Sequence, residues 1–335
     1  MRLGITTTVP VEILLAGGHT PVDLNNVFIT NENSDNFIAI AHEAGFPRTL
    51  CSWIKGQYSA VLNAANVDAV IAVVTGDCSN TQAMIELLEC EHLPVYRFSY
   101  PSDNKSPFAY KDLKAQFERL ANYLNVPMEH VYSQLKTLEP LRAKLTELDD
   151  LTNIGQVSGR DNHTWLVSSS DFNGDVNRYE RELDEFLAVA RLKKPNQSAI
   201  RLGYVGVPTI INNLYDFISS KGAEVYFNEV ERQFSIPSRA PELIQRYLDY
   251  TYPYDVYSRI ADIKREIAAR QLDGLVHYAQ AFCHRQLQDV AFRKHLDIPI
   301  LTLEGDAPTA LDERSKIRIE SFIEMLQAKR VKNGQ

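Results

Sequence analysis

The chain has 335 residues, of which 44% are hydrophobic, and a formal net charge of −8. This length predicts two domains, and the hydrophobic content is ample for sizeable cores. The negative charge argues against nucleic acid or an anionic membrane surface as the main partner, and four cysteines are too few for a secreted scaffold built on disulfides.

The N-terminal stretch MRLGITTTVPVEILLAGG has one basic residue and a short apolar run, with no small-residue cleavage site after it. It therefore lacks the features of a secretory signal peptide. No other stretch approaches the roughly 20 consecutive apolar residues that a membrane-spanning helix needs. We therefore expect a cytoplasmic protein with no membrane partner, in which thiols stay reduced.

Residues 1–104 alternate strand-like and helix-like segments and predict an N-terminal α/β lobe. The expected strands lie at 2–8, 69–74 and 93–101. The expected helices are one that starts after Pro10 and ends at Gly17–Gly18, an amphipathic helix at 36–45, and one at 79–90. The glycines of LAGGHTP (15–21) could cradle an anion, but a helix cap is the favoured interpretation.

Residues 105–197 lose this alternation and predict a helical insert. Apolar residues recur at helical spacing across 113–148. Pro140 lies within that pattern and predicts a break in the helix. A further amphipathic helix is expected at 179–192, and the polar stretch 193–198 resembles a linker at the end of the insert.

Residues 198–335 return to the alternation of strands and helices and predict a C-terminal α/β lobe. Its expected elements are strands at 200–208, 223–230, 274–280 and 298–306, and helices at 209–221, 241–250, 257–272 and 315–330. Because strands that alternate with helices form parallel sheets with right-handed crossovers, each lobe is expected to hold a parallel sheet. The order of elements is similar in both lobes, which favours two related domains.

Three of the four cysteines lie at junctions between predicted elements. Cys78 ends the run DAVIAVVTGDC, Cys283 ends the similar run DGLVHYAQAFC, and Cys51 opens the helix-like segment CSWIKGQYSAVL. Thiols at strand ends fall on the edge where open parallel sheets bind their ligands. Three soft ligands that converge there suit an iron–sulfur cluster better than a disulfide or a catalytic thiol. Cys90 ends a predicted helix and is assigned to packing.

Other interpretations stay open at this point. A cysteine outside a disulfide is often a small buried apolar residue, and the chain has no CxxC pair. Zinc could be held instead by the three junction cysteines with His92, His277 or His284. Glu12, in the first turn of the first helix, can simply complement the helix dipole, or it can orient a substrate or act as a base.

Several segments together resemble one known family, the 2-hydroxyacyl-CoA dehydratase D-component family, which also includes benzoyl-CoA reductase subunits and double-cubane-cluster proteins. The segments are PRTLCSWIKG (47–56), TGDC (75–78), QAFCHRQLQD (280–289), IPILTLEGD (298–306) and RSKIRIESFIEML (314–326). The resemblance spans nearly the whole chain. Four cysteines cannot supply the six thiolates of a double cubane in one chain, so that subgroup is not expected.

The resemblance implies a fold, a cofactor and partners. The fold would be α/β, with two flavodoxin-like parallel-sheet lobes and a helical insert between them. Cys51, Cys78 and Cys283 would hold a 4Fe–4S cluster. The partners would be an acyl-CoA substrate, a separate ATP-dependent iron–sulfur activator protein, and a second subunit in a homodimer or a heterodimer. The absence of a GxxxxGK[ST] motif from this chain is compatible with ATP hydrolysis by a separate activator.

The resemblance also implies a reaction. Three protein thiolates leave one iron of the cluster open to act as a Lewis acid on a substrate hydroxyl. A lyase of this family, working anaerobically, would add one electron to a 2-hydroxyacyl-CoA, form a ketyl radical and eliminate water; low-potential reduction of an acyl-CoA is the related reaction. Glu12 is the candidate catalytic residue near the open iron. The alternative is a non-catalytic iron–sulfur electron carrier or regulator of the same fold.

Overall fold

The computed structural model of the chain describes residues 1–196 and 199–332. The chain divides into two compact units, each assembled from separate segments. Unit 1 consists of Met1–Lys144, Val167–Glu182 and Gln233–Asp255, and unit 2 consists of Leu145–Leu166, Leu183–Arg232 and Val256–Gln335. The predicted boundary at residues 197 and 198, with the end of the predicted linker, lies outside the described residues, and the three predicted domains stay a prediction.

Unit 1 contains a parallel sheet in the strand order β2-β1-β3-β4. Its strands are β1 (Arg2–Ile5), β2 (Thr20–Asp23), β3 (Ala69–Thr75) and β4 (Val95–Ser99). Its helices are α1 (Val11–Ala16), α2 (Leu24–Ile29), α3 (Ser34–Glu43), α4 (Ser52–Asn63), α5 (Asn80–Cys90), α6 (Ala109–Tyr123), α12 (Leu243–Asp249) and the short 3₁₀ helix η1 (Phe172–Gly174). β3 is an apolar run that is buried along most of its length, as expected for a central strand of a parallel sheet.

Strand β2 is an element that the periodicity of the sequence does not predict. Its residues TPVD include a proline and an aspartate, which are rare in strands. The proline is tolerated because β2 is an edge strand, where one side of the strand has no neighbour to bond. Gly17 is the C-cap of α1 just before this strand, in agreement with the favoured interpretation of LAGGHTP.

Unit 2 contains a parallel sheet in the strand order β6-β5-β7-β8. Its strands are β5 (Ile200–Gly206), β6 (Ala223–Asn228), β7 (Gly274–Gln280) and β8 (Ile300–Gly305). Its helices are α10 (Leu214–Ser220), α13 (Val256–Arg270), η2 (His284–Leu287), α14 (Gln288–His295) and α15 (Glu313–Lys332). Every residue of β7 is buried, so this strand occupies the centre of its sheet.

Four further helices have residues in both units: α7 (Met128–Asn153), α8 (Gly159–Ser168), α9 (Val176–Ala190) and α11 (Glu229–Phe234). The predicted break at Pro140 is wrong, because α7 continues through this residue. A proline inside a helix removes one backbone hydrogen bond. The neighbouring Leu138 and Leu141 are both fully buried, and their burial offsets the loss of that bond.

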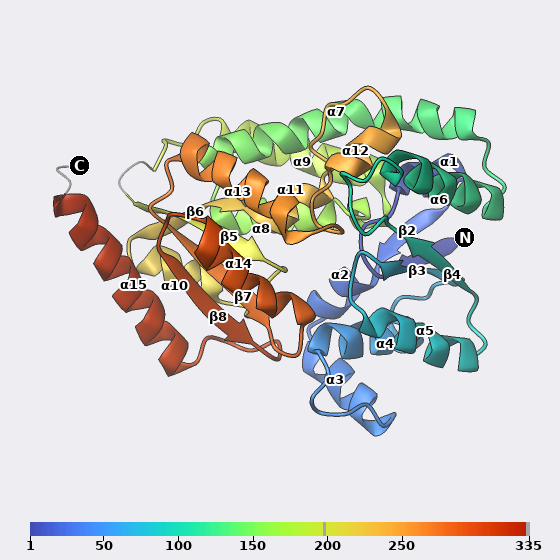
Figure 1. Ribbon diagram of the computed structural model, residues 1–335, viewed down its shortest axis with the longest axis horizontal. Helices are drawn as coiled ribbons and strands as arrows, with labels where there is room; N and C mark the ends of the chain where they lie inside the picture. Colours follow the sequence, from blue (N-terminus) through green and yellow to red (C-terminus); the bar gives the residue numbers. More distant parts are fainter. Residues whose placement is uncertain (197–198, 333–335) are drawn as a thin grey trace. The chain divides into compact units, whose positions relative to one another are not determined.

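These two sheets confirm the predicted α/β fold with two flavodoxin-like parallel-sheet lobes (Figure 1). In each unit the second strand of the chain pairs with one side of the first strand, and the third strand pairs with its other side. This is the order with which a flavodoxin-like sheet begins. Each sheet therefore has one switch point, where the chain turns from one side of the first strand to the other.

Each unit has its own hydrophobic core. The unit 1 cluster is built from β2 and β3, which pair with β1, and from the helices α2, α3, α4 and α5. Its buried members include Val22, Leu24, Ala41, Cys51, Ile54, Tyr58, Val70, Ala72, Met84, Ile85 and Leu88. The unit 2 cluster joins its sheet to α13 and α14 through Val205, Tyr226, Phe227, Ile260, Ile263, Leu275 and Phe292. Both clusters hold the helices that follow the strand ends, and those helices position the candidate site.

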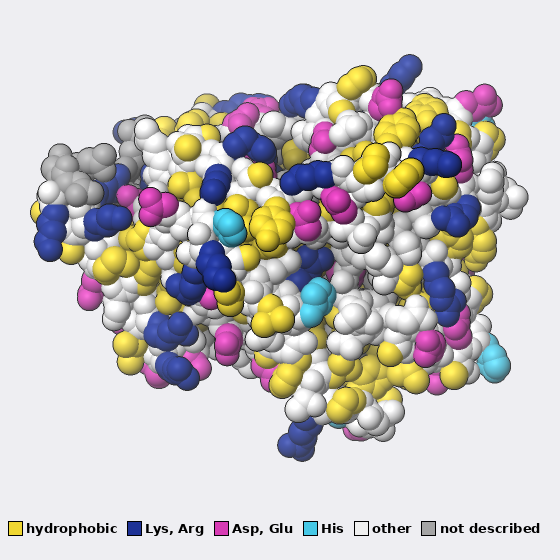
Figure 2. All heavy atoms as spheres, viewed as in Figure 1, with side chains coloured by type: hydrophobic (Ala, Val, Ile, Leu, Met, Phe, Trp, Pro, Cys, Tyr) yellow, Lys and Arg dark blue, Asp and Glu magenta, His cyan; other side chains and the backbone are white. Residues whose placement is uncertain are grey.

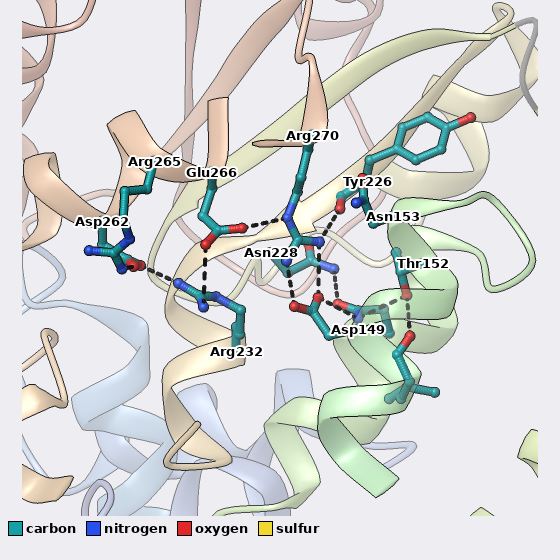
Figure 3. A network of polar contacts seen from close by, with 12 residues as sticks. Asp149, Thr152, Asn153, Tyr226, Asn228, Arg232, Asp262, Arg265, Glu266 and Arg270 are labelled. Atoms are coloured by element: carbon teal, nitrogen blue, oxygen red, sulfur yellow. Dashed lines mark hydrogen bonds and ion pairs between the residues drawn. The ribbon is translucent and has the colours of Figure 1, made fainter. Parts of the chain in front are cut away.

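A network of arginine–carboxylate pairs runs through unit 2 (Figure 3). Arg270 on α13 pairs with Asp149 on α7, and its Nε lies 2.7 Å from Glu266. Arg232 on α11 pairs with Asp262, and it lies 3.6 Å from Glu266. Because both arginines are largely buried, each depends on its carboxylate partners for stabilisation. The network therefore links α13 to α7 and to α11 through ion pairs.

On the face drawn in Figure 2, basic and acidic side chains are interspersed rather than gathered by sign. Among the described residues, no helix is both long enough and apolar enough to cross a membrane.

Candidate functional site

Two of the junction cysteines occupy equivalent places in the two sheets. Cys78 is the third residue after Thr75, the end of β3, and Cys283 is the third residue after Gln280, the end of β7. β3 and β7 are the third strands of their units, and each pairs with the first strand at the switch point. Open α/β sheets bind their ligands at the carboxyl ends of the strands on either side of a switch point.

Cys51 is the N-cap residue of α4, a helix of 12 residues. Its side chain is buried, and its carbonyl oxygen accepts hydrogen bonds from the backbone N–H of Ile54 and Lys55 at 3.1 and 3.3 Å. The N-terminus of a helix carries a partial positive charge, which stabilises a thiolate relative to a thiol. Burial in the apolar cluster of unit 1 acts in the opposite direction and favours the thiol, so the ligand role of Cys51 stays a prediction.

Cys51 and Cys78 pack against the same hydrophobic cluster of unit 1. Cys78 stands two residues before α5, and its carbonyl oxygen accepts from the backbone N–H of Thr81 at 3.1 Å. The structure thus brings two of the three predicted ligands to one core, while Cys283 belongs to unit 2. Among the described residues, no group of three or more His, Cys, Asp and Glu is arranged to hold a metal ion, and the ligand assignment stays a prediction.

The turn before Cys78 is held in place by residues 251–255. Gly76 has φ +102°, and a Cβ at this position would lie 2.9 Å from Cβ of Pro253 and 3.0 Å from Cβ of Tyr100. The Tyr252 hydroxyl donates to Asp77 Oδ1 at 3.1 Å. Only glycine fits this backbone and this spacing. The TGDC turn therefore has a defined conformation.

Buried tyrosines surround the carboxyl end of β1. The Tyr100 hydroxyl donates to the carbonyl oxygen of Thr8 at 2.9 Å. The ring of Tyr100 contacts the rings of Tyr250 and Tyr254, with 6.0 Å between centroids in each case. Burial raises the pKa of Tyr100 well above its usual value. This phenol therefore stays neutral and acts as a hydrogen-bond donor.

Glu12, the predicted catalytic residue, lies on α1 and is completely buried. One carboxylate oxygen lies 2.6 Å from Arg142 Nη2 on α7, and the other accepts from the Tyr247 hydroxyl on α12 at 2.8 Å. These contacts support a role in joining three helices of unit 1. A catalytic role for Glu12 stays a prediction.

Among the buried oxygens of unit 1 without a hydrogen-bond partner in the described residues are Thr8 Oγ1, Gln57 Oε1 and Thr81 Oγ1. Thr8 follows β1, Gln57 lies on the helix that Cys51 opens, and Thr81 lies on the helix that follows Cys78. Buried polar atoms without partners are rare in folded proteins. A polar ligand or an ordered water is the usual partner of such atoms, while the soft thiols of Cys51 and Cys78 are the donors that suit an iron–sulfur cluster.

In unit 2, Cys283 lines a small pocket of about 10 Å³, room for roughly one water molecule, together with Gly206, Arg259 and His277. Arg259 binds the buried Glu229 through two nitrogens, each 2.6 Å from a carboxylate oxygen. The second of these oxygens also accepts from the backbone N–H of Gly206 at 3.0 Å. The charge of Arg259 is thereby neutralised, and the end of β5 is fixed beside the pocket.

His277, one of the histidines considered for zinc, has its Nδ1 2.8 Å from Asp289 Oδ1. This contact, with hydrogen bonds from Thr302 and Arg293, lowers the pKa of Asp289. His284 directly follows Cys283, and burial together with the charge of Arg285 lowers its pKa. The third, His92, is exposed at the end of α5 in unit 1.

Several residues of this site are not predicted by sequence reasoning. Asn25 lies at the start of α2, and Lys55 and Gln57 lie within CSWIKGQYS on α4; the last two are buried. Polar residues on a helix are normally expected on its exposed face. The only signal for Lys55 and Gln57 was their position within two turns of Cys51 at the start of α4, and no signal in the sequence singled out Asn25.

Comparison with known proteins gives three findings. A family model described as 2-hydroxyglutaryl-CoA dehydratase, D-component, matches residues 6–326. No curated protein matches the chain. Among solved structures, a periplasmic heme-binding protein from Pseudomonas aeruginosa is similar over 97% of this chain and 92% of that chain, with 14% identity and a TM-score of 0.24. A likeness this weak carries no argument about fold or function.

Proposed function

This chain belongs to the 2-hydroxyglutaryl-CoA dehydratase D-component family, and from that membership we propose that it is the iron–sulfur subunit of a 2-hydroxyacyl-CoA dehydratase-like enzyme. The observation that carries the proposal is the equivalent placement of Cys78 and Cys283, each three residues after the third strand of its sheet. Both cysteines follow the carboxyl end of a strand, which is the edge where an open α/β sheet binds its ligands.

Cys51, Cys78 and Cys283 would hold a 4Fe–4S cluster. When bound through three thiolates, such a cluster supplies an open iron that acts as a Lewis acid on a hydroxyl group. The helix start at Cys51 favours the thiolate form that this ligation needs. The apolar cluster that both unit 1 cysteines contact keeps water from one side of the site.

The proposed substrate is a 2-hydroxyacyl-CoA, and the proposed reaction is radical elimination of water through a ketyl intermediate, or the related low-potential reduction of an acyl-CoA. The electron would come from an ATP-dependent iron–sulfur activator protein. The family implies a partner subunit, which would be a second copy of this chain or a related chain. The alternative is an electron carrier or regulator of the same fold without turnover.

Iron and acid-labile sulfide analysis after anaerobic purification tests the proposal. We expect about four irons and four sulfides per chain. Cys51→Ser, Cys78→Ser and Cys283→Ser should each lose most of this content. Cys90→Ser is the matched control, because Cys90 is exposed at the end of α5, and it should keep full iron content. Stoichiometric zinc in the wild type, or full iron in Cys283→Ser, would contradict the assignment.

A second measurement separates an enzyme from a carrier. Acyl-CoA esters are titrated into the reduced protein while the electron paramagnetic resonance spectrum is recorded. A subunit that binds substrate at the cluster should show a spectral change with 2-hydroxyacyl-CoA. An unchanged spectrum with every ester, in a protein of full iron content, would favour the carrier.

A further inference from the structure

Gln57 has an unusual environment for a glutamine on a helix. It lies on α4, and only 3% of its surface is exposed. Its Nε2 donates to Asn25 Oδ1 at 2.6 Å and reaches the carbonyl oxygen of Thr6 at 3.4 Å. Its Oε1 is buried and accepts no hydrogen bond from the described residues. Thr6 directly follows β1, so this oxygen lies at the ligand-binding edge of the sheet.

The orientation of the Gln57 amide is fixed by a chain of hydrogen bonds. Asp23 Oδ1 accepts from both the backbone N–H and the Nδ2 of Asn25, at 2.9 and 3.0 Å. Asn25 Nδ2 also donates to the Thr6 carbonyl oxygen at 2.8 Å. These two contacts orient the Asn25 amide, because its Nδ2 faces two acceptors. Asn25 Oδ1 therefore faces Gln57 as an acceptor, so the atom of Gln57 that faces it must be the donor Nε2.

A flip of the Gln57 amide would place its oxygen against Asn25 Oδ1 and the Thr6 carbonyl oxygen, which are both acceptors. The observed orientation is therefore the only one that the network satisfies, and it leaves Oε1 as an acceptor without a donor. A buried acceptor in this state costs free energy until a donor reaches it. A hydroxyl group or an N–H group can supply that donor, whereas a carbonyl or a carboxylate cannot.

We propose that Gln57 Oε1 accepts a hydrogen bond from the 2-hydroxyl group of the acyl chain of the substrate. The assignment rests on the proposed function, which supplies a ligand with a hydroxyl at the reacting carbon. Asp23 and Asn25 act on the substrate only through Gln57, and they are positioning residues. The contact favours a hydroxyacyl ester over the corresponding ester without the hydroxyl, since the latter leaves Oε1 without a donor.

Thr8 gives independent support for a ligand at this place. Its Oγ1 is a second buried oxygen without a partner among the described residues. Thr8 lies two residues after Thr6, on the same segment that the Gln57 amide contacts. A hydroxyl group of a ligand both donates and accepts, so it can satisfy Gln57 Oε1 and receive a hydrogen bond from a threonine hydroxyl.

Calorimetric binding to the anaerobic, cluster-loaded protein tests the inference without any turnover. The probes are two matched pairs of esters, 2-hydroxyglutaryl-CoA with glutaryl-CoA and lactoyl-CoA with propanoyl-CoA. Gln57→Met removes the acceptor and keeps the length of the side chain. The preference is the ratio of the dissociation constants of the ester without the hydroxyl and the ester with it, taken for the pair that binds better. We expect this ratio to be larger in the wild type than in Gln57→Met by roughly tenfold or more. The comparison of the two proteins removes any preference due to the iron.

Ser59→Ala is the matched control. Ser59 lies on the same helix and is also buried, but its hydroxyl donates to the Phe37 carbonyl oxygen at 2.6 Å. This variant should keep the wild-type preference. If Gln57→Met does not fold, Gln57→Glu provides the second test. It keeps the shape, and in the protonated form its O–H takes the place of Nε2 toward Asn25 Oδ1 while the other carboxyl oxygen takes the place of Oε1, so it should retain a preference close to that of the wild type.

The failures of the two proposals can be distinguished. If neither ester of either pair binds the wild type, the proposed function fails and the assignment of Gln57 fails with it. If the esters bind but the preference is the same in the wild type and in Gln57→Met, the proposed function stands and the Gln57 contact is overturned. A buried water is then the donor to Oε1.

Discussion

Asp23 and Asp171 place two buried carboxyl groups side by side in unit 1. The backbone N–H of Asp23 donates to Asp171 Oδ2 at 2.7 Å, and the Ser170 hydroxyl donates to Asp23 Oδ2 at 2.6 Å. The hydrogen-bond partners of the pair among the described residues are neutral donors. Burial and the charge of Asp23 raise the pKa of Asp171 to about 7, and burial also raises the pKa of Asp23.

This pair predicts a stability that falls as pH rises. Between the pKa of Asp171 in the unfolded chain, near 4, and its folded value of about 7, the folded protein holds a proton that the unfolded chain has lost. The free energy of unfolding should therefore decrease across this window. Asp171→Asn should flatten this pH dependence, and it should lower the free energy of unfolding at both pH values because its Nδ2 replaces an oxygen that accepts from a backbone N–H.

Urea denaturation at pH 5.5 and pH 8 measures the effect. Asp175→Asn is the control, since Asp175 lies on the same segment but is exposed, and it should leave the pH dependence unchanged. Equal pH dependence in Asp171→Asn and the wild type would exclude this pair as its source.

At the scale of single residues, the sequence singles out the cysteines but not Gln57 or Asp171. A cysteine that ends an apolar run is visible in the order of residues. Whether a polar side chain is buried depends on segments that approach it from elsewhere, such as Ser170 against Asp23. Those approaches involve separations of more than 140 residues, which no local pattern encodes.

Among the elements, the TGDC turn depends on a close approach of two segments. Gly76 and Gly45 both have positive φ, +102° and +95°, but a Cβ at Gly45 would meet nothing within 4 Å. Gly45→Ala should cost about 1 kcal/mol through backbone conformation alone. Gly76→Ala should cost clearly more, because the new methyl group would overlap with Pro253.

Amide hydrogen exchange provides the readout for this pair of variants. In Gly76→Ala, exchange at residues 251–255 should accelerate, since those residues pack on the turn. In Gly45→Ala it should stay at the wild-type rate. The same exchange rates in both variants would show that the contact does not fix the turn.

The arginine–carboxylate network makes a different prediction for α7 and α13 of unit 2 (Figure 3). Arg270→Met leaves the buried Asp149 and the partly buried Glu266 without this cation, which should cost about 3 to 5 kcal/mol. The double variant Arg270→Met, Asp149→Leu should lose much less than the sum of the two single variants, because it removes both charges.

The same double-mutant cycle on the exposed pair of Arg160 and Asp216 is the reference. Both side chains are more than half exposed, so their coupling should stay within about 1 kcal/mol in chemical denaturation. A coupling between Arg270 and Asp149 no larger than this would mean that the buried network adds nothing to stability.

Elements with strong periodicity were predictable, and those set by context were not. β7 lies at 274–280 as its continuous apolar run predicts. The strands expected from the sequence wrongly omit β2. This segment is a strand because it pairs with β1, and its composition does not indicate one. The break at Pro140 is wrong because packing of the surrounding leucines outweighs the lost hydrogen bond.

For the whole molecule, alternation of strands and helices was enough to predict two parallel-sheet lobes, and the two sheets have the same strand order. The composition of the units was beyond sequence reasoning. Segments 167–182 and 233–255 belong to unit 1, although their apolar residues would suit a core in either unit. An amphipathic pattern says that a face is buried and does not say against which partner.

The discontinuous composition of unit 1 has a consequence for synthesis of the protein. A ribosome builds the first sheet early, but that unit still lacks residues 233–255 until most of the chain has been translated. Tyr247, which binds Glu12, arrives only with this last segment. Nascent chains therefore hold the first lobe unfinished until residues 233–255 emerge, and we expect a fragment that ends at residue 144 to be less stable than unit 1 of the full chain.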